Sequence, residues 1–429
     1  MLSSGSADRS TSYHLDHYTT IVNNSNKDEI PENEYLHTNK YHPTILSNVS
    51  PNDSFQFSIV IPHYNQLSFI QSTMDSVFNQ KCDNVSFQVT IVDDGSTEWN
   101  TKEKLLSLFK HYEQYLNITV IFNRNSGLSF SRNIGIENSR AEWILPLDSD
   151  DMIDSTFLLK SWTLIKEQDE LQNNIIIIPG LRYIDYKSTF AHLTQNVKSI
   201  ELGEWEIPVW NANDIKYRNL LHCSGIYRKS LWKSIGGYNP TLWFGWEDWD
   251  FWLRADRATK GIKPLLIKGE PLFNYRLKNG MHSFCKENYQ LCFSLFQTIH
   301  HTEYSIEDVI MAQKYIGIHG QSIKSSIMSK IKVFSDNSIL HFWMALIYQY
   351  AQYNSETQKF SNISKANDYY TMALDYSPNG VTWQIILQKS LMNLGSVNNY
   401  LKSKKDLLQL YEKNKQLEEL VLRIYDVSV

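Results

Sequence analysis

Residues 143–151 read WILPLDSDD, a short apolar run that ends in three carboxylates. A run of this length, rich in aromatic and branched residues, is typical of a buried β-strand. Three like charges within four residues are costly unless a cation neutralises them. Oxygen-only ligands suit Mg²⁺ or Mn²⁺, and such an ion can also hold a diphosphate. The stretch therefore predicts a strand whose carboxyl end carries a metal-binding site.

Three similar apolar runs occur upstream, at residues 57–61, 89–92 and 118–122. Apolar residues with helical spacing lie between them, at Leu67, Ile70, Met74 and Val77, and at Leu105, Leu106, Phe109 and Tyr112. Strands that alternate with helices predict a mainly parallel sheet with helices on both faces. In such folds ligands bind beyond the carboxyl ends of the strands, so the residues that follow each strand are the candidates for function.

Composition narrows the class of protein. The chain has 429 residues, enough for two or three domains of about 150 residues. A formal charge of −5 argues against binding of nucleic acid or capture of anionic lipid by a basic field. Four cysteines without CxxC spacing indicate reduced thiols rather than a disulfide scaffold or a zinc site. No secretion signal is recognisable, and no apolar stretch approaches the ~18 to 20 residues of a transmembrane helix. A cytoplasmic location is expected, with peripheral membrane attachment left open.

The composition and hydrophobic pattern of the sequence divide it into three regions. Residues 1–54 are polar and without a sustained period, which predicts a tail. Residues 55–295 carry the strands and are expected to form the α/β domain, and residues 303–429 read as successive helices.

The helical region contains a partial repeat. Its spacing resembles a tetratricopeptide unit at Trp343, Leu346, Ile347 and Tyr350, and at Ala366, Tyr370, Ala373 and Pro378. A plain helical bundle is favoured over a repeat-like helical pair, because stable arrays need about three copies.

Two other strand ends carry candidate binding residues. In residues 61–65 (IPHYN), Pro62 lacks an amide donor and suits a ladder end, which leaves the Tyr64 ring on a loop where it could stack on a base. Residues 92–96 (VDDGS) place two carboxylates where one could accept from a base or a sugar hydroxyl. An ordinary strand end and an Asp-Gly turn with Ser96 as a helix cap are the structural alternatives.

Two further segments carry charged residues. A helix is predicted over residues 128–138, and its Arg132 could face a diphosphate or a neighbouring carboxylate, or be an ordinary surface arginine. Residues 243–250 (WFGWEDWD) enclose an acidic pair with three tryptophans. This setting raises a carboxylate pKa and excludes water, as a general base requires. A capped helix start in a Trp-rich core is the alternative.

Taken in order, these motifs resemble the family-two inverting glycosyltransferases of the GT-A fold. The likeness extends over about residues 55–290 and rests on residues 61–65, 93–96, 125–127 with 131–135, 147–151 and 247–248. It implies a GT-A Rossmann-like nucleotide-diphospho-sugar transferase domain, followed here by an all-α region.

The resemblance also implies roles for single residues. Asp248 matches the catalytic base and Glu247 its neighbour at the acceptor or donor sugar. Asp150 matches the ligand of Mn²⁺ or Mg²⁺, and His282 lies where many relatives place a metal-binding or phosphate-contacting histidine, although a surface loop explains it equally well. The donor-binding positions are Pro62, Tyr64, Asn65, Asp93, Asp94, Gly127, Arg132 and Asp148, with Asp93, Tyr64 and Pro62 at the base and ribose.

The implied reaction transfers a sugar from a nucleotide diphosphate sugar, UDP-linked in particular, to a hydroxyl of a glycan or glycoconjugate, with inversion. A processive polymerase is disfavoured because the Q-x-x-R-W signature and membrane helices of such synthases are missing. A decayed transferase that serves as a scaffold is the alternative. A nucleotidyltransferase is disfavoured because no Gly-rich phosphate loop follows Ile61. The helical region is a candidate for binding a protein partner.

Overall fold

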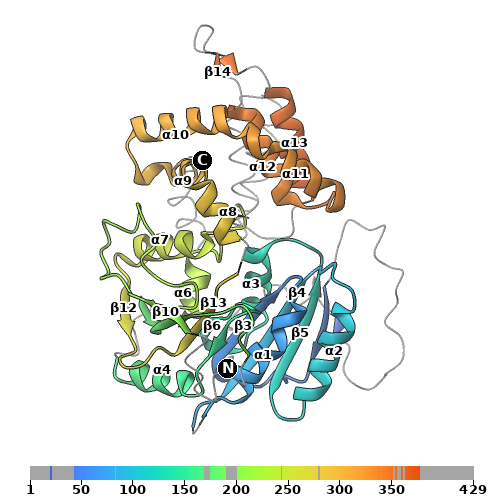
Figure 1. Ribbon diagram of the computed structural model, residues 1–429, viewed down its shortest axis with the longest axis vertical. Coiled ribbons are helices and arrows are strands. Elements are labelled where there is room, and N and C mark those ends of the chain that lie inside the picture. The colour runs from blue at the N-terminus through green and yellow to red at the C-terminus, as the bar shows by residue number, and fades with distance from the viewer. Residues whose placement is uncertain are drawn as a thin grey trace, which may run out of the picture.

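The computed structural model describes residues 20–21, 43–82, 84–168, 174–189, 201–242, 244–278, 281–350, 353–354, 359–360 and 363–376. Predictions that concern Trp243, Pro378 and most of residues 1–54 lie outside the described residues. In the described part, an α/β region forms one end of the molecule and a group of helices lies against it (Figure 1).

A seven-stranded sheet forms the centre of the α/β region, in the order β1-β2-β5-β4-β3-β6-β11. Its strands are β1 Thr20–Ile21, β2 Thr44–Ser47, β3 Phe55–His63, β4 Phe87–Asp94, β5 Asn117–Asn123, β6 Ala141–Pro146 and β11 Tyr227–Arg228. The central strands β5, β4, β3 and β6 are parallel, and β2 and β11 pair with them antiparallel. The predicted apolar runs lie within these central strands, as expected for strands covered on both faces.

Helices cover both faces of this sheet. They are α1 Leu67–Phe78, α2 Thr101–Tyr112, α3 Leu128–Glu137, α4 Phe157–Lys166, α6 Lys229–Ser234 and α7 Glu247–Thr259. Ile59 and Ile61 pack in one core with α1, α2 and α4, whereas Val60 packs in another with α3, α6 and α7. This follows from the two-residue period of a strand. Gly135 lets α3 approach β3 closely, since an added Cβ would lie 2.5 Å from Val60 Cγ1.

Smaller sheets extend the α/β region beyond β6. A four-stranded sheet has the order β10-β9-β13-β7, and a two-stranded parallel sheet joins β12 to β8. Their strands are β7 Met152–Ile153, β8 Ile175–Ile178, β9 Leu181–Ile184, β10 Glu201–Trp205, β12 Lys263–Leu266 and β13 Phe273–Arg276. Because Asn274 pairs with Met152, the end of β13 lies beside the acidic segment that follows β6.

The remaining described elements are helical apart from one small hairpin. They are α8 Met281–Glu287, α9 Tyr289–Ile299, the 3₁₀-helix η2 His301–Glu303, α10 Ile306–His319, α11 Gln321–Val333, α12 Ser338–Tyr350, β14 Tyr353–Asn354, β15 Lys359–Phe360 and α13 Ile363–Asp375. Trp343 and Tyr370, predicted as repeat residues, are fully buried in a core that α12 and α13 share with neighbouring helices. None of the helices in the described ranges is long and apolar enough to span a bilayer. The predicted fold class, an α/β Rossmann-like domain followed by a helical region, is confirmed, although the helical region also contains the hairpin β14–β15.

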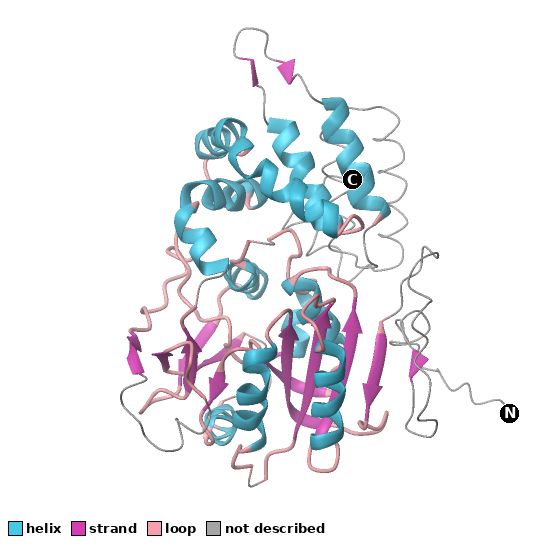
Figure 2. Cartoon of the chain, turned by 45° about the vertical axis from the view of Figure 1, so that its right-hand side comes forward, coloured by secondary structure: helices cyan, strands magenta, loops and turns pink. Residues whose placement is uncertain are grey.

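The central strands point toward the helical region. Figure 2 shows the carboxyl ends of the parallel strands directed at the helices. Residues at those ends therefore lie between the sheet and the helical layer. Thr44–Ser47, within the segment predicted as a polar tail, forms β2 and pairs with β5, and its Ile45 is buried.

Candidate active site

Arg132 joins two carboxylates that are far apart in the sequence. Its guanidinium donates to Asp148 Oδ1 at 2.7 Å, just after β6, and to Glu247 Oε1, at the start of α7. The arginine is only 1% exposed. Burial alone would lower the pKa of Arg132, but the charges of Asp148 and Glu247 outweigh it and raise this pKa well above its usual value. The buried Arg132 guanidinium thus contacts both the end of β6 and the start of α7, which lie side by side.

The carboxylate pair at residues 247–248 begins α7 after two residues in left-handed backbone, Gly245 at φ +114° and Trp246 at φ +66°. Asp248 accepts from Asn219 Nδ2 at 2.9 Å and from the Trp249 amide at 2.8 Å. Burial, and then the neighbouring Glu247 charge, raise the pKa of Asp248 to about 7. A carboxylate of this pKa can accept a proton near neutral pH.

The acidic segment after β6 is held by residues from the end of β13. Asp150 forms an ion pair with Lys278, and its carbonyl accepts from Arg276 Nε at 2.6 Å. Asp151 Oδ1 accepts the Arg276 amide at 2.9 Å, whereas Asp151 Oδ2 is buried without a hydrogen-bond partner. Burial raises the pKa of both Asp150 and Asp151, and the nearby Asp148 charge adds to it. Within the described residues, Lys278 is the cation that pairs with Asp150, and its charge opposes the rise of the Asp150 pKa.

These carboxylates suit Mg²⁺ or Mn²⁺ chemically. Mg²⁺ in nucleotide sites typically takes one or two carboxylates and completes its shell with substrate phosphates and water. Asp148 and Asp150 offer such oxygens, and the unpartnered Asp151 Oδ2 is consistent with a site that attracts positive charge. Among the described residues no group of three His, Cys, Asp or Glu side chains is arranged to hold a metal by itself. The backbone of His282 lies in α8, but its side chain lies outside what the structure describes.

The ends of β3 and β4 form a hydrogen-bonded corner. Asp93 Oδ1 accepts from Ser96 Oγ at 2.6 Å and lies 3.1 Å from His63 Nδ1. Pro62 pairs with Val92 and does not end the ladder, which continues to His63 and Asp93. The reason is that a parallel strand can place a proline where its missing amide faces away from the neighbour.

The loop after β3 is held against the loop after β4. Asn65 has φ +52°, and its Oδ1 accepts the amides of Thr97 and Glu98, each at 2.9 Å. Tyr64 lies between these residues and the helical region, with its ring 6.4 Å from the ring of Phe334. Burial raises the pKa of the Tyr64 hydroxyl, so the ring stays neutral.

Asp94 fixes the loop that precedes α3. Its Oδ1 accepts the Ser126 amide at 2.8 Å, and its Oδ2 accepts the Gly127 amide at 2.9 Å. Burial raises the pKa of Asp94 to about 7, although the two amides oppose the shift. Gly127 has φ +92°, a conformation that glycine adopts without strain. Both carboxylate oxygens are therefore engaged by the chain itself.

Sequence reasoning missed several residues that contact the acidic side chains, among them Arg276, whose amide donates to Asp151. Lys278 and Asn219 pair with Asp150 and Asp248. Lys278 follows a strand, β13, so the rule that functional residues follow strand ends could have found it. Asn219 lies in a turn segment that gives no comparable signal.

Part of this chain is similar to known glycosyltransferases. Residues 58–235 match the family model described as Glycosyl transferase family 2. An uncharacterized glycosyltransferase of Haemophilus influenzae is 29% identical over 198 residues, which are 46% of this chain and 60% of that protein. A poly(ribitol-phosphate) beta-glucosyltransferase of Bacillus spizizenii is 35% identical over 114 residues, 26% of this chain and 17% of that protein.

Among solved structures, S. aureus TarS 1-349 in complex with UDP-GlcNAc has a TM-score of 0.41 and 16% identity, over 84% of this chain and 92% of that chain. The chain thus spans 60% or less of the length of these two sequence relatives. The family match ends at residue 235, before the acidic pair at residues 247–248. The family match covers most of β3, all of β4, β5 and β6, and the acidic segment after β6. Residues 58–235, which lie in the α/β region, are therefore similar to glycosyltransferase family 2.

Proposed function

We propose that this chain transfers a sugar from a nucleotide diphosphate sugar, in particular a UDP-sugar, to a hydroxyl group of a glycan or glycoconjugate. The observation that carries the proposal is the bridge from Asp148 through Arg132 to Glu247. It supports a single site, because it brings the acidic end of β6 against the carboxylate pair that begins α7. The family match supports the reaction class.

Asp248 is the proposed general base. It accepts the proton of the acceptor hydroxyl as that oxygen bonds to the anomeric carbon, and the bond from this carbon to the diphosphate breaks. Attack opposite the leaving group inverts the anomeric centre. Glu247 is proposed to contact the donor or acceptor sugar, and Arg132 holds it in place.

The donor is proposed to lie along the ends of β3, β4 and β6. Tyr64 would stack on the base, with Asp93 and Pro62 beside the base and ribose. Asp148 would lie near the ribose. Asn65 and Asp94 would act indirectly, because their side chains hold the surrounding loops.

A divalent cation is part of the proposal. Asp150 would hold Mg²⁺ or Mn²⁺ together with the diphosphate, with His282 as a further proposed ligand. When bound, the cation would neutralise the negative charge that develops on the leaving diphosphate. Arg132 supplies a positive charge from the chain itself on the same side of the site.

Nucleotide sugars are expected to stabilise the folded chain. A ligand that binds only the native state at 100 times its dissociation constant contributes about 2.7 kcal/mol. We expect at least one UDP-sugar, in the presence of Mn²⁺, to raise the unfolding temperature by several degrees, and GDP-mannose to have less effect. A thermal-unfolding screen with UDP-glucose, UDP-GlcNAc, UDP-galactose and GDP-mannose tests this. No shift with any of them at millimolar concentration would contradict the proposal. Poly(ribitol phosphate) is the first acceptor to test with the donor that binds.

Asp150→Ala is expected to weaken UDP binding about tenfold or more in Mn²⁺. Without the carboxylate the diphosphate loses its shared cation, whereas in EDTA the variant and the parent should bind alike. Titration calorimetry in the two buffers measures the difference. Asp214→Ala, which removes an exposed carboxylate paired with Arg218, is the matched control. An equal loss in both buffers would indicate a structural defect instead.

A further inference from the structure

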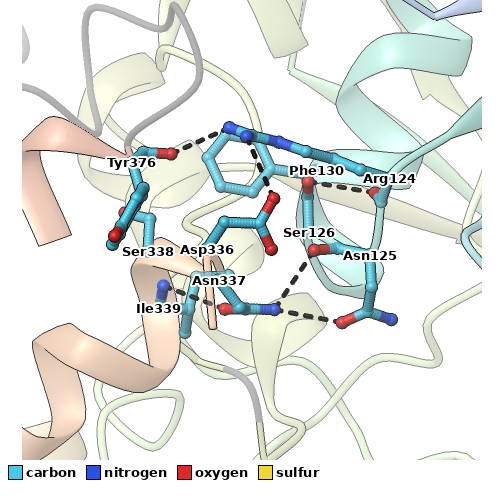
Figure 3. Close-up of a pocket in the computed structure, with 9 residues that line it drawn as sticks. All are labelled: Arg124, Asn125, Ser126, Phe130, Asp336, Asn337, Ser338, Ile339 and Tyr376. Carbon is cyan, nitrogen blue, oxygen red and sulfur yellow. Dashed lines mark hydrogen bonds and ion pairs between the residues drawn. The ribbon is translucent and has the colours of Figure 1, made fainter. Parts of the chain in front are cut away.

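The start of α12 is attached to the loop that precedes α3. Asn337 Nδ2 donates to the carbonyl of Asn125 at 3.2 Å and to Asn125 Oδ1 at 3.0 Å. Arg124 donates to the carbonyl of Tyr376 at 2.8 Å and lies 3.5 Å from Asp336. Figure 3 shows these side chains meeting across the boundary between the two regions. The helical region thus contacts residues 124–127, here called the donor loop because Gly127 is one of the predicted donor-binding positions.

The same donor loop is held from inside by Asp94. The Asn125 side chain donates to the carbonyl of Asp94 at 3.0 Å, and the next two amides donate to the Asp94 carboxylate. Ile339 packs against Gly127, where an added Cβ would lie 3.2 Å from Ile339 Cδ1. The loop is therefore held on both sides, by Asp94 within the α/β region and by the buried Asn337 and Ile339 of the helical region.

A second contact of α12 reaches the other half of the site. Trp343 Nε1 donates to the carbonyl of Thr241 at 2.7 Å, and its ring lies 5.2 Å from that of Phe244. These residues lead directly into Glu247 and Asp248. Residues of α12 and its start thus contact both the donor loop and the segment that leads to the proposed general base Asp248.

We infer that Asn337 is a positioning residue for nucleotide binding, which it supports by fixing the donor loop against Asp94. The inference rests on the proposed function. Asn337 also accepts the amides of Ile339 and Leu340, at 3.0 and 3.2 Å, and so caps α12. The test must therefore separate two functions of the Asn337 side chain: its Oδ1 caps α12, and its Nδ2 donates to the donor loop.

Two substitutions make that separation. Asn337→Ser and Asn337→Asp both keep an oxygen that can cap a helix, and both remove the amide donor. Ser305→Ala is the matched control, because Ser305 caps α10 and the hydrogen bonds described for its hydroxyl go to Asp308 rather than to the donor loop. All variants are made in the full chain.

Two measurements are compared, the dissociation constant for UDP with Mn²⁺ and amide exchange of a peptide that covers residues 124–127. Loss of the two hydrogen bonds from Asn337 Nδ2 to Asn125 is expected to weaken UDP binding about threefold to tenfold in both Asn337 variants. We also expect faster exchange at the Ser126 and Gly127 amides. Ser305→Ala should alter neither quantity, even if it lowers the unfolding temperature.

The outcomes are distinct. Unchanged UDP affinity in both Asn337 variants overturns the inference, whatever their unfolding temperature. Equal weakening in Ser305→Ala also overturns it, because a general effect of helix stability then explains the loss. A parent chain that binds no UDP removes the proposed function, and this inference with it.

Discussion

An Asp248→Asn variant is expected to lose sugar transfer while binding UDP like the parent. The substitution keeps the size of the side chain but removes the group that accepts the acceptor proton, and general-base catalysis contributes about 10² to 10⁴ in rate. We expect kcat to fall by that factor. Product formation and UDP calorimetry on the same preparation measure the two quantities. The matched control is Asp214→Asn, an exposed aspartate paired with Arg218. Turnover equal to that of the parent would remove Asp248 from the mechanism.

The pH profile of the parent adds a second readout for the same residue. Burial and the Glu247 charge raise the pKa of Asp248 to about 7. The base works only when deprotonated, so kcat/KM should fall as the pH decreases below about 7 and level off above it. A flat profile between pH 5 and 8 would contradict the assignment.

Replacing Arg132 by methionine is expected to destabilise the protein strongly. The change leaves Glu247 buried without its cation, and breaking a buried ion pair from one side typically costs about 3 to 5 kcal/mol. UDP binding should weaken as well, because Asp148 loses the same partner. Urea unfolding, read as the midpoint at a constant slope, measures the loss.

The control for that variant is the same substitution at an exposed ion pair. Arg218 is 61% exposed in its side chain and pairs with Asp214 at 2.6 Å, so Arg218→Met should cost at most about 1 kcal/mol. Adding Glu247→Gln and Asp148→Asn to Arg132→Met should restore part of the stability, because the unpaired charges are then gone. A loss no larger than that of Arg218→Met would mean that the Arg132 bridge is not a structural element of the site.

The sheet could be predicted from the sequence because its signal is local. The runs at residues 57–61, 89–92 and 118–122 are continuous and β-branched, as buried parallel strands require, and they lie within β3, β4 and β5. The helix predicted over residues 128–138 corresponds to α3, Leu128–Glu137. Strand β2 was missed because four residues in a polar context carry too little pattern.

The contacts within the site depend on residues far apart in the chain. The acidic stretch after β6 is visible in the sequence, but its pairing with Lys278 depends on how β13 lies beside β7. For Arg132 the sequence left a diphosphate, a neighbouring carboxylate and an exposed surface position open, and the geometry gives two carboxylates. The contact of Asn337 with Asn125 spans 212 residues and has no local signature. The roles of the individual site residues remain predictions.

The contacts of α12 limit how this chain can be re-engineered. Asn337 and Trp343 place hydrogen bonds from one helix on loops at two sides of the α/β region. A chimera that grafts a foreign carboxyl-terminal module onto the α/β region would have to recreate both attachments. The α/β region and the helical region are therefore expected to function in a chimera only when both are taken from the same protein.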